Sequence, residues 1–216
     1  MPDPTPRDPA AIRLDIFADP VCPWCLIGKA ELDRALSARP DHPFAITWHP
    51  FRLNPIFPQD GVPMDEYLRV KLEGRVEEVL GNLARRAEAL GITLIPPARE
   101  PNTTDAHRLM HWAGIEGAQT RIMSGLLAAH WREGRDIGDA QVLADIATGA
   151  GMDGAMVRRL LATDADRDHI AMAEAHARER GVTAVPTFII ADQYVVAGAQ
   201  PAELWLDVID ELTGAK

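Results

Sequence analysis

The sequence is poor in cysteine, in long apolar runs and in excess positive charge. Only two of its 216 residues are cysteine, Cys22 and Cys25. No apolar run approaches the roughly 20 residues that a membrane-spanning helix needs, so we expect no membrane partner. Acidic residues outnumber basic ones by 32 to 22, which gives a net charge of −10. Because nucleic-acid binding depends on basic patches, the charge also argues against a nucleic-acid partner.

The first residues lack the features of a secretory signal. Residues 1–9 are rich in proline and have neither a basic start nor an apolar core. We therefore expect residues 1–10 to form a disordered lead and, if the sequence is the complete precursor, the protein to be cytoplasmic. In a reducing compartment a lone cysteine pair is seldom a structural disulfide and is more often catalytic or metal-binding.

The two cysteines stand at a predicted junction between a strand and a helix. The apolar run 12–18 predicts a buried strand, and the spacing of apolar residues from Leu26 onward predicts a helix that ends near Ala38. At such a helix start, unpaired backbone N–H groups and the helix dipole favour the thiolate of the first cysteine. The second thiol, one turn further, can attack a mixed disulfide and release the substrate. The pair therefore predicts thiol–disulfide exchange, with Cys22 as nucleophile and Cys25 as resolving thiol.

Two other interpretations of the cysteines are half of a zinc site and two ordinary core residues. A structural zinc site needs four ligands, commonly a second cysteine pair or added histidines. The sequence has no further cysteine, and its seven histidines are scattered. We therefore expect no metal.

The pattern predicts strands near both ends of the chain. A second strand is expected at 44–49, and because a helix separates it from the strand at 12–18, the two should pair in parallel. Strands at 187–190 and 194–197 should form a β-hairpin. Pro201 then opens a last helix that runs through Leu212.

Between these strands the sequence predicts a block of helices. Asp139 and Thr163 are candidate N-caps, and the first segment should break near Gly74 or Gly81. The predicted helices are 64–90, 104–114, 117–133, 139–150, 154–162 and 163–180.

Four motifs, in order along the chain, resemble those of a known family. They are Asp-Pro-Val-Cys-Pro-Trp-Cys-Leu-Ile-Gly at 19–28, Pro-Phe-Arg-Leu-Asn-Pro at 50–55, Asn-Thr-Thr-Asp-Ala-His-Arg at 102–108 and Gly-Val-Thr-Ala-Val-Pro-Thr-Phe at 181–188. They resemble the DsbA-like branch of the thioredoxin-fold superfamily, and within it the FrnE-like group of polyketide-biosynthesis-type dithiol–disulfide isomerases. The resemblance implies an α/β fold: a thioredoxin fold with a large all-helical insertion. Residues 11–62 and 181–216 would form the discontinuous thioredoxin-like domain, and residues 63–180 the insertion domain.

The resemblance also assigns roles in the site. Cys22 would be the more exposed sulfur and Cys25 the buried one. Val185-Pro186 matches the cis-proline dipeptide of the family, which lies across from the cysteines. Because proline has no N–H, it cannot extend the sheet, and the backbone before it stays free to pair with an extended substrate.

Three polar residues, Asn54, Asn102 and His107, are candidates for substrate contact. Similar residues lie near the rim of the active site in the family. An alternative for Asn102, or for Thr103 and Thr104, is to cap the helix that follows.

Two residues between the cysteines, Pro23 and Trp24, should tune the redox potential of the pair. Trp24 should be exposed, whereas the other four tryptophans should lie in the core. Related enzymes carry a histidine here that stabilises the thiolate, and this chain has none. Asp19 would oppose a thiolate if it stays charged. We therefore expect a pair less oxidising than that of periplasmic DsbA.

The leading functional prediction is a thiol–disulfide oxidoreductase or isomerase that acts on a disulfide-containing protein or a small thiol. It needs no cofactor beyond its own Cys22–Cys25 disulfide, and thioredoxin or glutathione would recycle it. A second candidate is a glutathione-dependent isomerase or transferase of the kappa-class or hydroxychromene-carboxylate isomerase type, with glutathione as co-substrate. Such enzymes typically carry serine in place of the first cysteine. A third is a redox-switched holdase or interaction module. The sequence leaves the oligomeric state open, a homodimer included.

Overall fold

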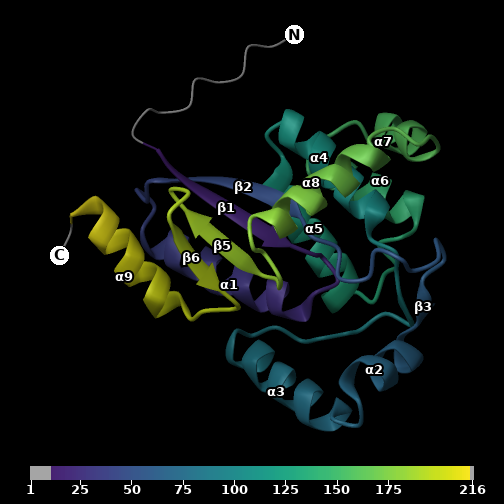
Figure 1. Cartoon of the computed structure of the whole chain (residues 1–216), viewed down its shortest axis with the longest axis horizontal. Coiled ribbons are helices and arrows are strands. Elements are labelled where there is room, and N and C mark those ends of the chain that lie inside the picture. Colours follow the sequence, from purple (N-terminus) through teal and green to yellow (C-terminus); the bar gives the residue numbers. More distant parts are fainter. Residues whose placement is uncertain (1–10, 215–216) are drawn as a thin grey trace.

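The computed structural model describes residues 11–214 (Figure 1). The predicted disordered lead, residues 1–10, lies outside the described residues. The strands are β1 (Ile12–Ala18), β2 (Phe44–Pro50), β3 (Val62–Pro63), β4 (Arg99–Glu100), β5 (Thr187–Ile190) and β6 (Tyr194–Ala197). The helices are α1 (Pro23–Ala38), α2 (Met64–Leu72), α3 (Val76–Ala89), α4 (Thr104–Ile115), α5 (Gln119–Arg132), α6 (Ala140–Gly149), α7 (Gly154–Leu161), α8 (Arg167–Glu179) and α9 (Ala202–Thr213).

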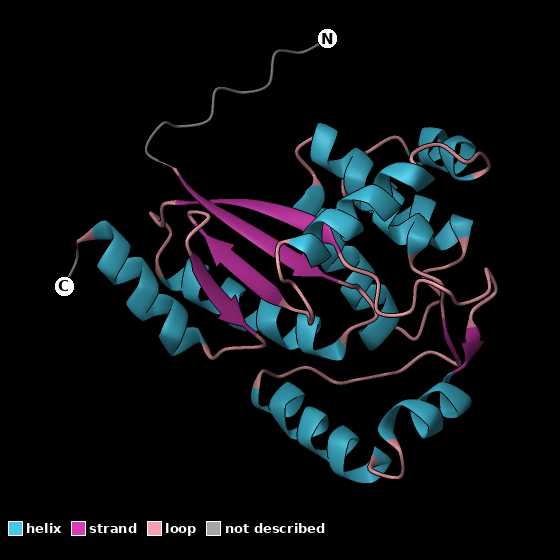
Figure 2. Cartoon of the chain, in the orientation of Figure 1, coloured by secondary structure: helices cyan, strands magenta, loops and turns pink. Residues whose placement is uncertain are grey.

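A four-stranded sheet with the order β2-β1-β5-β6 forms the centre of the molecule. β1 pairs with β2 in parallel, as predicted, and with β5 in antiparallel orientation. β5 and β6 form the predicted hairpin. The predicted α/β architecture, with helices inserted between two groups of strands, is confirmed (Figure 2).

Helices cover both faces of the sheet because successive side chains of a strand point to opposite faces. Leu14 of β1 belongs to the main core together with Trp205 of α9, which is fully buried. Phe17 of β1 points to the other face and packs in a second cluster with Ala177 of α8. The sheet therefore lies between α1 with α9 on one side and α8 on the other.

The inserted helices do not form an independent core. Trp48 of β2 shares the main core with Leu109 of α4 and Leu126 of α5, and its indole Nε1 donates to Thr120 Oγ1 at 3.0 Å. The short ladder of β3 and β4, which the sequence pattern did not predict, leads into α2. In Figure 1, α2 and α3 form an arm apart from α4–α8.

Most predicted helix ends agree with the structure, with one clear error. Asp139 caps α6, accepting bonds from Gln141 N and Val142 N, and the first segment breaks at Gly74, whose φ is +85°. Thr163 was expected to cap α8, but this helix begins only after Asp166. Thr163 Oγ1 instead donates a hydrogen bond backward along the chain, to Leu160 O of α7 at 2.7 Å. Such local bonds of threonine compete with a helix start.

Among residues 11–214, no helix is both long and apolar enough to cross a membrane. These same residues bring no group of three or more histidine, cysteine, aspartate or glutamate side chains together in a geometry that could hold a metal ion.

Candidate active site

Cys22 occupies the N-cap position of α1. Its φ and ψ of −81° and 116° are extended, and Pro23 begins the helix, which suits proline because the first helical N–H has no partner within the helix. The carbonyl of Cys22 accepts the first helical bonds, from Cys25 N at 3.0 Å and Leu26 N at 3.3 Å. The reactive motif is therefore fixed by the start of a helix rather than by a mobile loop.

Both cysteines carry free thiols and are buried. Cys22 is 4% exposed and Cys25 is 2% exposed. Cys22 is therefore the more exposed of the two, as predicted, but the difference is small. Burial raises the pKa of the Cys25 thiol well above its usual value. A hydrogen bond between the two cysteine side chains and the charges of Cys22 and Asp19 add to this effect. Cys25 is accordingly kept as a thiol, which suits a group that must not attack first.

The predicted dipeptide Val185-Pro186 lies directly against Cys22. The Cys22 thiol donates to the carbonyl oxygen of Val185 at 3.5 Å, and the Val185–Pro186 peptide bond is cis. Gly28 makes this approach possible, because a Cβ at this position would lie 3.0 Å from Pro186 Cγ. The two motifs, which are far apart in the sequence, thus form one site.

A largely apolar cavity of about 290 Å³ opens beside Cys22. Its walls come from the cysteine motif, from Val185 and the residues before it, and from the arm of α2 and α3. Trp24 lines it and is half-buried rather than exposed as predicted. The reason is that Trp24 packs against the cluster around Leu83 of the arm. Among the described residues that line this cavity, Lys71 and Glu100 alone carry an ammonium or a carboxyl group.

Asp19 lies buried behind the cysteine pair, fully inaccessible to solvent. Its Oδ2 accepts from Leu53 N at 2.7 Å and from Thr103 Oγ1 at 3.4 Å. Its Oδ1 has no hydrogen bond and faces His107 Nε2 at 3.4 Å. The loop that supplies Leu53 is held by Arg52, whose Nε donates to Glu174 Oε2 of α8 at 2.8 Å.

Glu100 is a second buried carboxyl, only 1% exposed. Burial and the nearby negative charge of Asp19 raise the pKa of Glu100 to about 9. Burial lowers the pKa of its neighbour His130 to about 4. Near neutral pH both groups are therefore uncharged, so the 3.7 Å contact between His130 Nε2 and Glu100 Oε2 is not an ion pair and is too long for a hydrogen bond.

The three candidate substrate contacts lie behind the cavity rather than on its wall. Asn54 donates to Glu100 Oε1 at 3.4 Å, and His107 faces Asp19. Asn102 lies one residue before Thr103, which is the N-cap of α4 and makes no side-chain capping bond. Asn102 Oδ1 accepts from Thr104 N at 3.0 Å, and its Nδ2 donates to Phe57 O at 2.6 Å.

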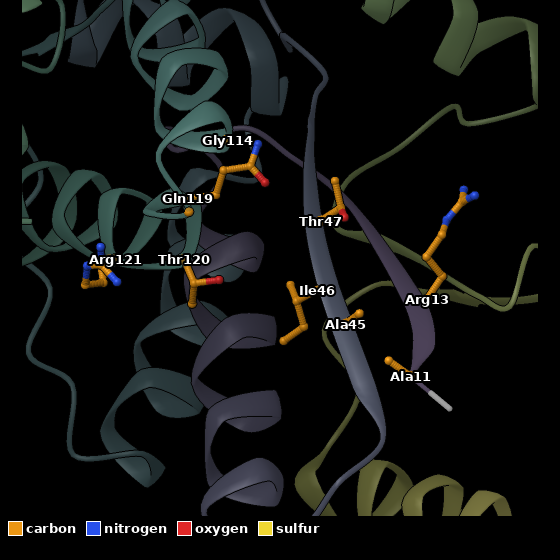
Figure 3. A pocket seen from close by; sticks show the side chains of 10 residues that line it. Ala11, Arg13, Ala45, Ile46, Thr47, Gly114, Gln119, Thr120 and Arg121 are labelled. Carbon is orange, nitrogen blue, oxygen red and sulfur yellow. The ribbon is translucent and has the colours of Figure 1, made fainter. Parts of the chain in front are cut away.

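A larger cavity of about 490 Å³ lies elsewhere, between the outer edge of β2 and the turn from α4 to α5 (Figure 3). Its two arginines do not converge on a ligand: Arg13 binds Asp15, and Arg121 donates to Ala150 O at 3.1 Å. Figure 3 shows the two side chains on opposite sides of the view. None of the described residues that line this cavity is a cysteine, histidine, lysine, aspartate or glutamate, so we place the candidate site at the smaller one.

The chain is similar to known proteins over most of its length. The family model described as a DSBA-like thioredoxin domain matches residues 13–210. The uncharacterized protein YwbO of Bacillus subtilis strain 168 is 28% identical over 204 residues, which cover 93% of this chain and 96% of YwbO. A crystal structure of a probable DsbA oxidoreductase from Streptomyces coelicolor is 31% identical, with a TM-score of 0.83 over 95% of this chain and 91% of that chain. A 2-hydroxychromene-2-carboxylate isomerase is similar in fold, with 20% identity and a TM-score of 0.69 over 94% and 97% of the two chains.

Proposed function

Because the chain belongs to the family of DSBA-like thioredoxin domains and is 31% identical to a probable DsbA oxidoreductase, we propose that it is a dithiol enzyme whose reactive pair is Cys22 and Cys25. One observation carries the proposal. Cys22 stands at a helix N-cap on the wall of a cavity, with its sulfur 3.5 Å from Val185 O and the resolving thiol buried one turn behind it.

The reaction proceeds by two exchanges. The thiolate of Cys22 attacks a substrate disulfide and forms a mixed disulfide, releasing the first substrate thiol. Cys25 then attacks the sulfur of Cys22, which releases the second substrate thiol and leaves a Cys22–Cys25 disulfide. The backbone at Val185 is available to pair with an extended substrate beside the attacked sulfur. The same steps in reverse would oxidise a dithiol substrate.

The covalent intermediate provides the direct test of this proposal. Reduced Cys25→Ser protein mixed with a disulfide such as oxidised glutathione is expected to accumulate one adduct on Cys22, because the resolving thiol is gone. Intact-mass and peptide mass spectrometry identify the adduct. Cys22→Ser is the matched control, and its buried Cys25, with a raised pKa, should react slowly. Equal adduct yields in the two variants would contradict the assigned order of attack.

We expect the pair to act as a reductant or isomerase rather than as a strong oxidant. No histidine stands between the cysteines, and the charge of Asp19 disfavours a second thiolate at Cys25. Because a stabilised reduced form is what makes a pair oxidising, its potential should lie well below the value of about −120 mV of the strongest oxidants. Equilibrium titration against glutathione or dithiothreitol buffers measures it, and a value near that limit contradicts the expectation. Under this proposal thioredoxin or glutathione recycles the pair in the cytoplasm.

A further inference from the structure

We propose that Glu100, contributed by β4 between α3 and α4, is the proton donor of this site and protonates the substrate sulfur that leaves Cys22. The inference rests on the proposed dithiol function and adds a catalytic residue that lies far from both cysteines in the sequence. It is carried by the position of Glu100 on the wall of the cavity beside Cys22.

Glu100 is buried, and its carboxyl group is incompletely hydrogen-bonded. Its side chain is 1% exposed, and its Oε2 makes no hydrogen bond within the described residues and lies 3.7 Å from His130 Nε2, which is also unbonded. Its Oε1 accepts a long bond from Asn54 Nδ2 at 3.4 Å. Buried polar atoms are nearly always bonded, so this unbonded oxygen needs an explanation. Because Glu100 also lines the cavity, a substrate sulfur bound there would supply a partner for its proton.

The fold holds Glu100 and Asp19 with the same two segments. Leu53 N–H donates to Asp19, and the next residue, Asn54, donates to Glu100. From the other side, Thr103 donates to Asp19 three residues after Glu100 itself. The two carboxyls are therefore held by neighbouring residues of the same segments, and Glu100 is the one that lines the cavity.

Glu100 holds its proton at neutral pH because burial and the charge of Asp19 raise its pKa to about 9. Lys71 and the hydroxyl of Tyr67 act in the opposite direction, and the charge of Cys22 acts in the same direction as that of Asp19. His130 is uncharged, with a pKa of about 4. The groups that face Glu100 are thus Asp19 and Cys22 from the β1–α1 junction, Tyr67 and Lys71 from α2, and His130 from α5.

The assigned step starts from a substrate joined to Cys22 as a mixed disulfide. Cys25 loses its proton to water, and its sulfur forms a bond with the sulfur of Cys22. The bond from Cys22 to the substrate sulfur breaks, and its electron pair stays on the substrate sulfur, which takes the proton of Glu100. The cysteines are oxidised to a disulfide and the substrate is reduced to a thiol. Uptake of a proton from water then restores Glu100.

The test uses Glu100→Gln and two disulfides that differ in the acidity of their thiols. An alkyl disulfide releases a basic thiolate that needs a proton, whereas a nitro-substituted aromatic disulfide releases a weakly basic thiolate that leaves without one. With the alkyl substrate, Glu100→Gln is expected to slow thiol release by about 10²-fold, the lower end of the range for general acid catalysis. With the aromatic substrate, the rate should be unchanged. Stopped-flow measurement of thiol release from the reduced protein reports both rates.

A second measurement needs no variant. In the unaltered protein the ratio of the alkyl rate to the aromatic rate should fall as the pH rises through about 9, where Glu100 loses its proton. In Glu100→Gln this ratio should not depend on pH in that range. Taking the ratio removes the pH dependence of Cys22 itself, because both substrates use the same nucleophile.

Glu31→Gln is the matched control. Glu31 is also a buried carboxyl, 7% exposed, but it lies on α1 and accepts from Ala202 N at 3.1 Å, and it does not line the cavity. It should leave both rates unchanged. Equal slowing of the two substrates by Glu100→Gln would show a structural role and overturn the proposal, as would no slowing of either. Failure of the dithiol function itself would appear separately, as exchange that persists in Cys22→Ser.

Discussion

Cys22→Ser is expected to lower the rate of disulfide reduction by roughly 10⁴-fold or more, the scale of loss seen when other covalent nucleophiles are removed. A serine hydroxyl at the N-cap of α1 would keep the bond to Val185 O, so the fold and the cavity should be retained. It would not ionise near neutral pH, however, and only the thiolate attacks a disulfide. Cys25 cannot take over, because it is buried and its pKa is raised.

Turbidity or fluorescence assays of insulin-type disulfide reduction measure this loss. Cys25→Ser is the informative comparison, since it keeps the first attack and loses only the release of the substrate. A single turnover that stalls in Cys25→Ser, with none in Cys22→Ser, separates the two roles. Retained multiple turnover in Cys22→Ser would contradict the proposed function.

The same variant distinguishes the glutathione-dependent alternative. Enzymes that activate glutathione typically carry serine in place of the first cysteine, so such an enzyme should keep its isomerase turnover in Cys22→Ser. A holdase would behave differently again. Its suppression of aggregation should persist when both Cys22 and Cys25 are replaced by serine, and assays on that double variant decide the matter.

Local sequence patterns were sufficient to place the reactive half of the site. A strand, a Cys-Pro-Trp-Cys motif and a helical pattern place Cys22 at a helix start, because proline at the first helical position and the apolar spacing after it are local signals. Pairing with Val185-Pro186 came from the resemblance to a family and is present in the structure. Thr163 shows the limit of such rules, since its hydroxyl had a competing local bond.

The protonation part of the site could not be predicted in this way. Glu100 and His130 are charged or polar residues in segments that look ordinary, and no spacing links them to Asp19. The raised pKa of Glu100 and the lowered pKa of His130 come first from burial, which is a property of the tertiary packing. Trp24 was predicted to be exposed for the same reason: nothing local indicates that the arm of α2 and α3 lies over it.

Glu100→Gln is expected to stabilise the folded protein, and the gain should grow with pH. In the unfolded chain a glutamate loses its proton near pH 4.3 or so, whereas in the folded protein Glu100 keeps it up to about 9. Between these values the unfolded state binds fewer protons than the folded state, so the free energy of unfolding falls as pH rises. Glutamine does not titrate and avoids this loss, which near neutral pH is on the order of 3 kcal/mol.

Chemical denaturation of both proteins between about pH 5 and pH 8 measures the difference in the free energy of unfolding. The pKa of His130 is lowered from 6.5 to about 4, so its contribution makes the free energy of unfolding rise with pH between these two values. This contribution is common to both proteins and cancels in the difference. In an Asp19→Asn background the gain from Glu100→Gln should shrink, because the charge that raises the pKa of Glu100 is gone. A difference that stays constant with pH would mean that Glu100 titrates in the folded protein as in the unfolded chain. The proton that the site is proposed to use would then be absent at neutral pH.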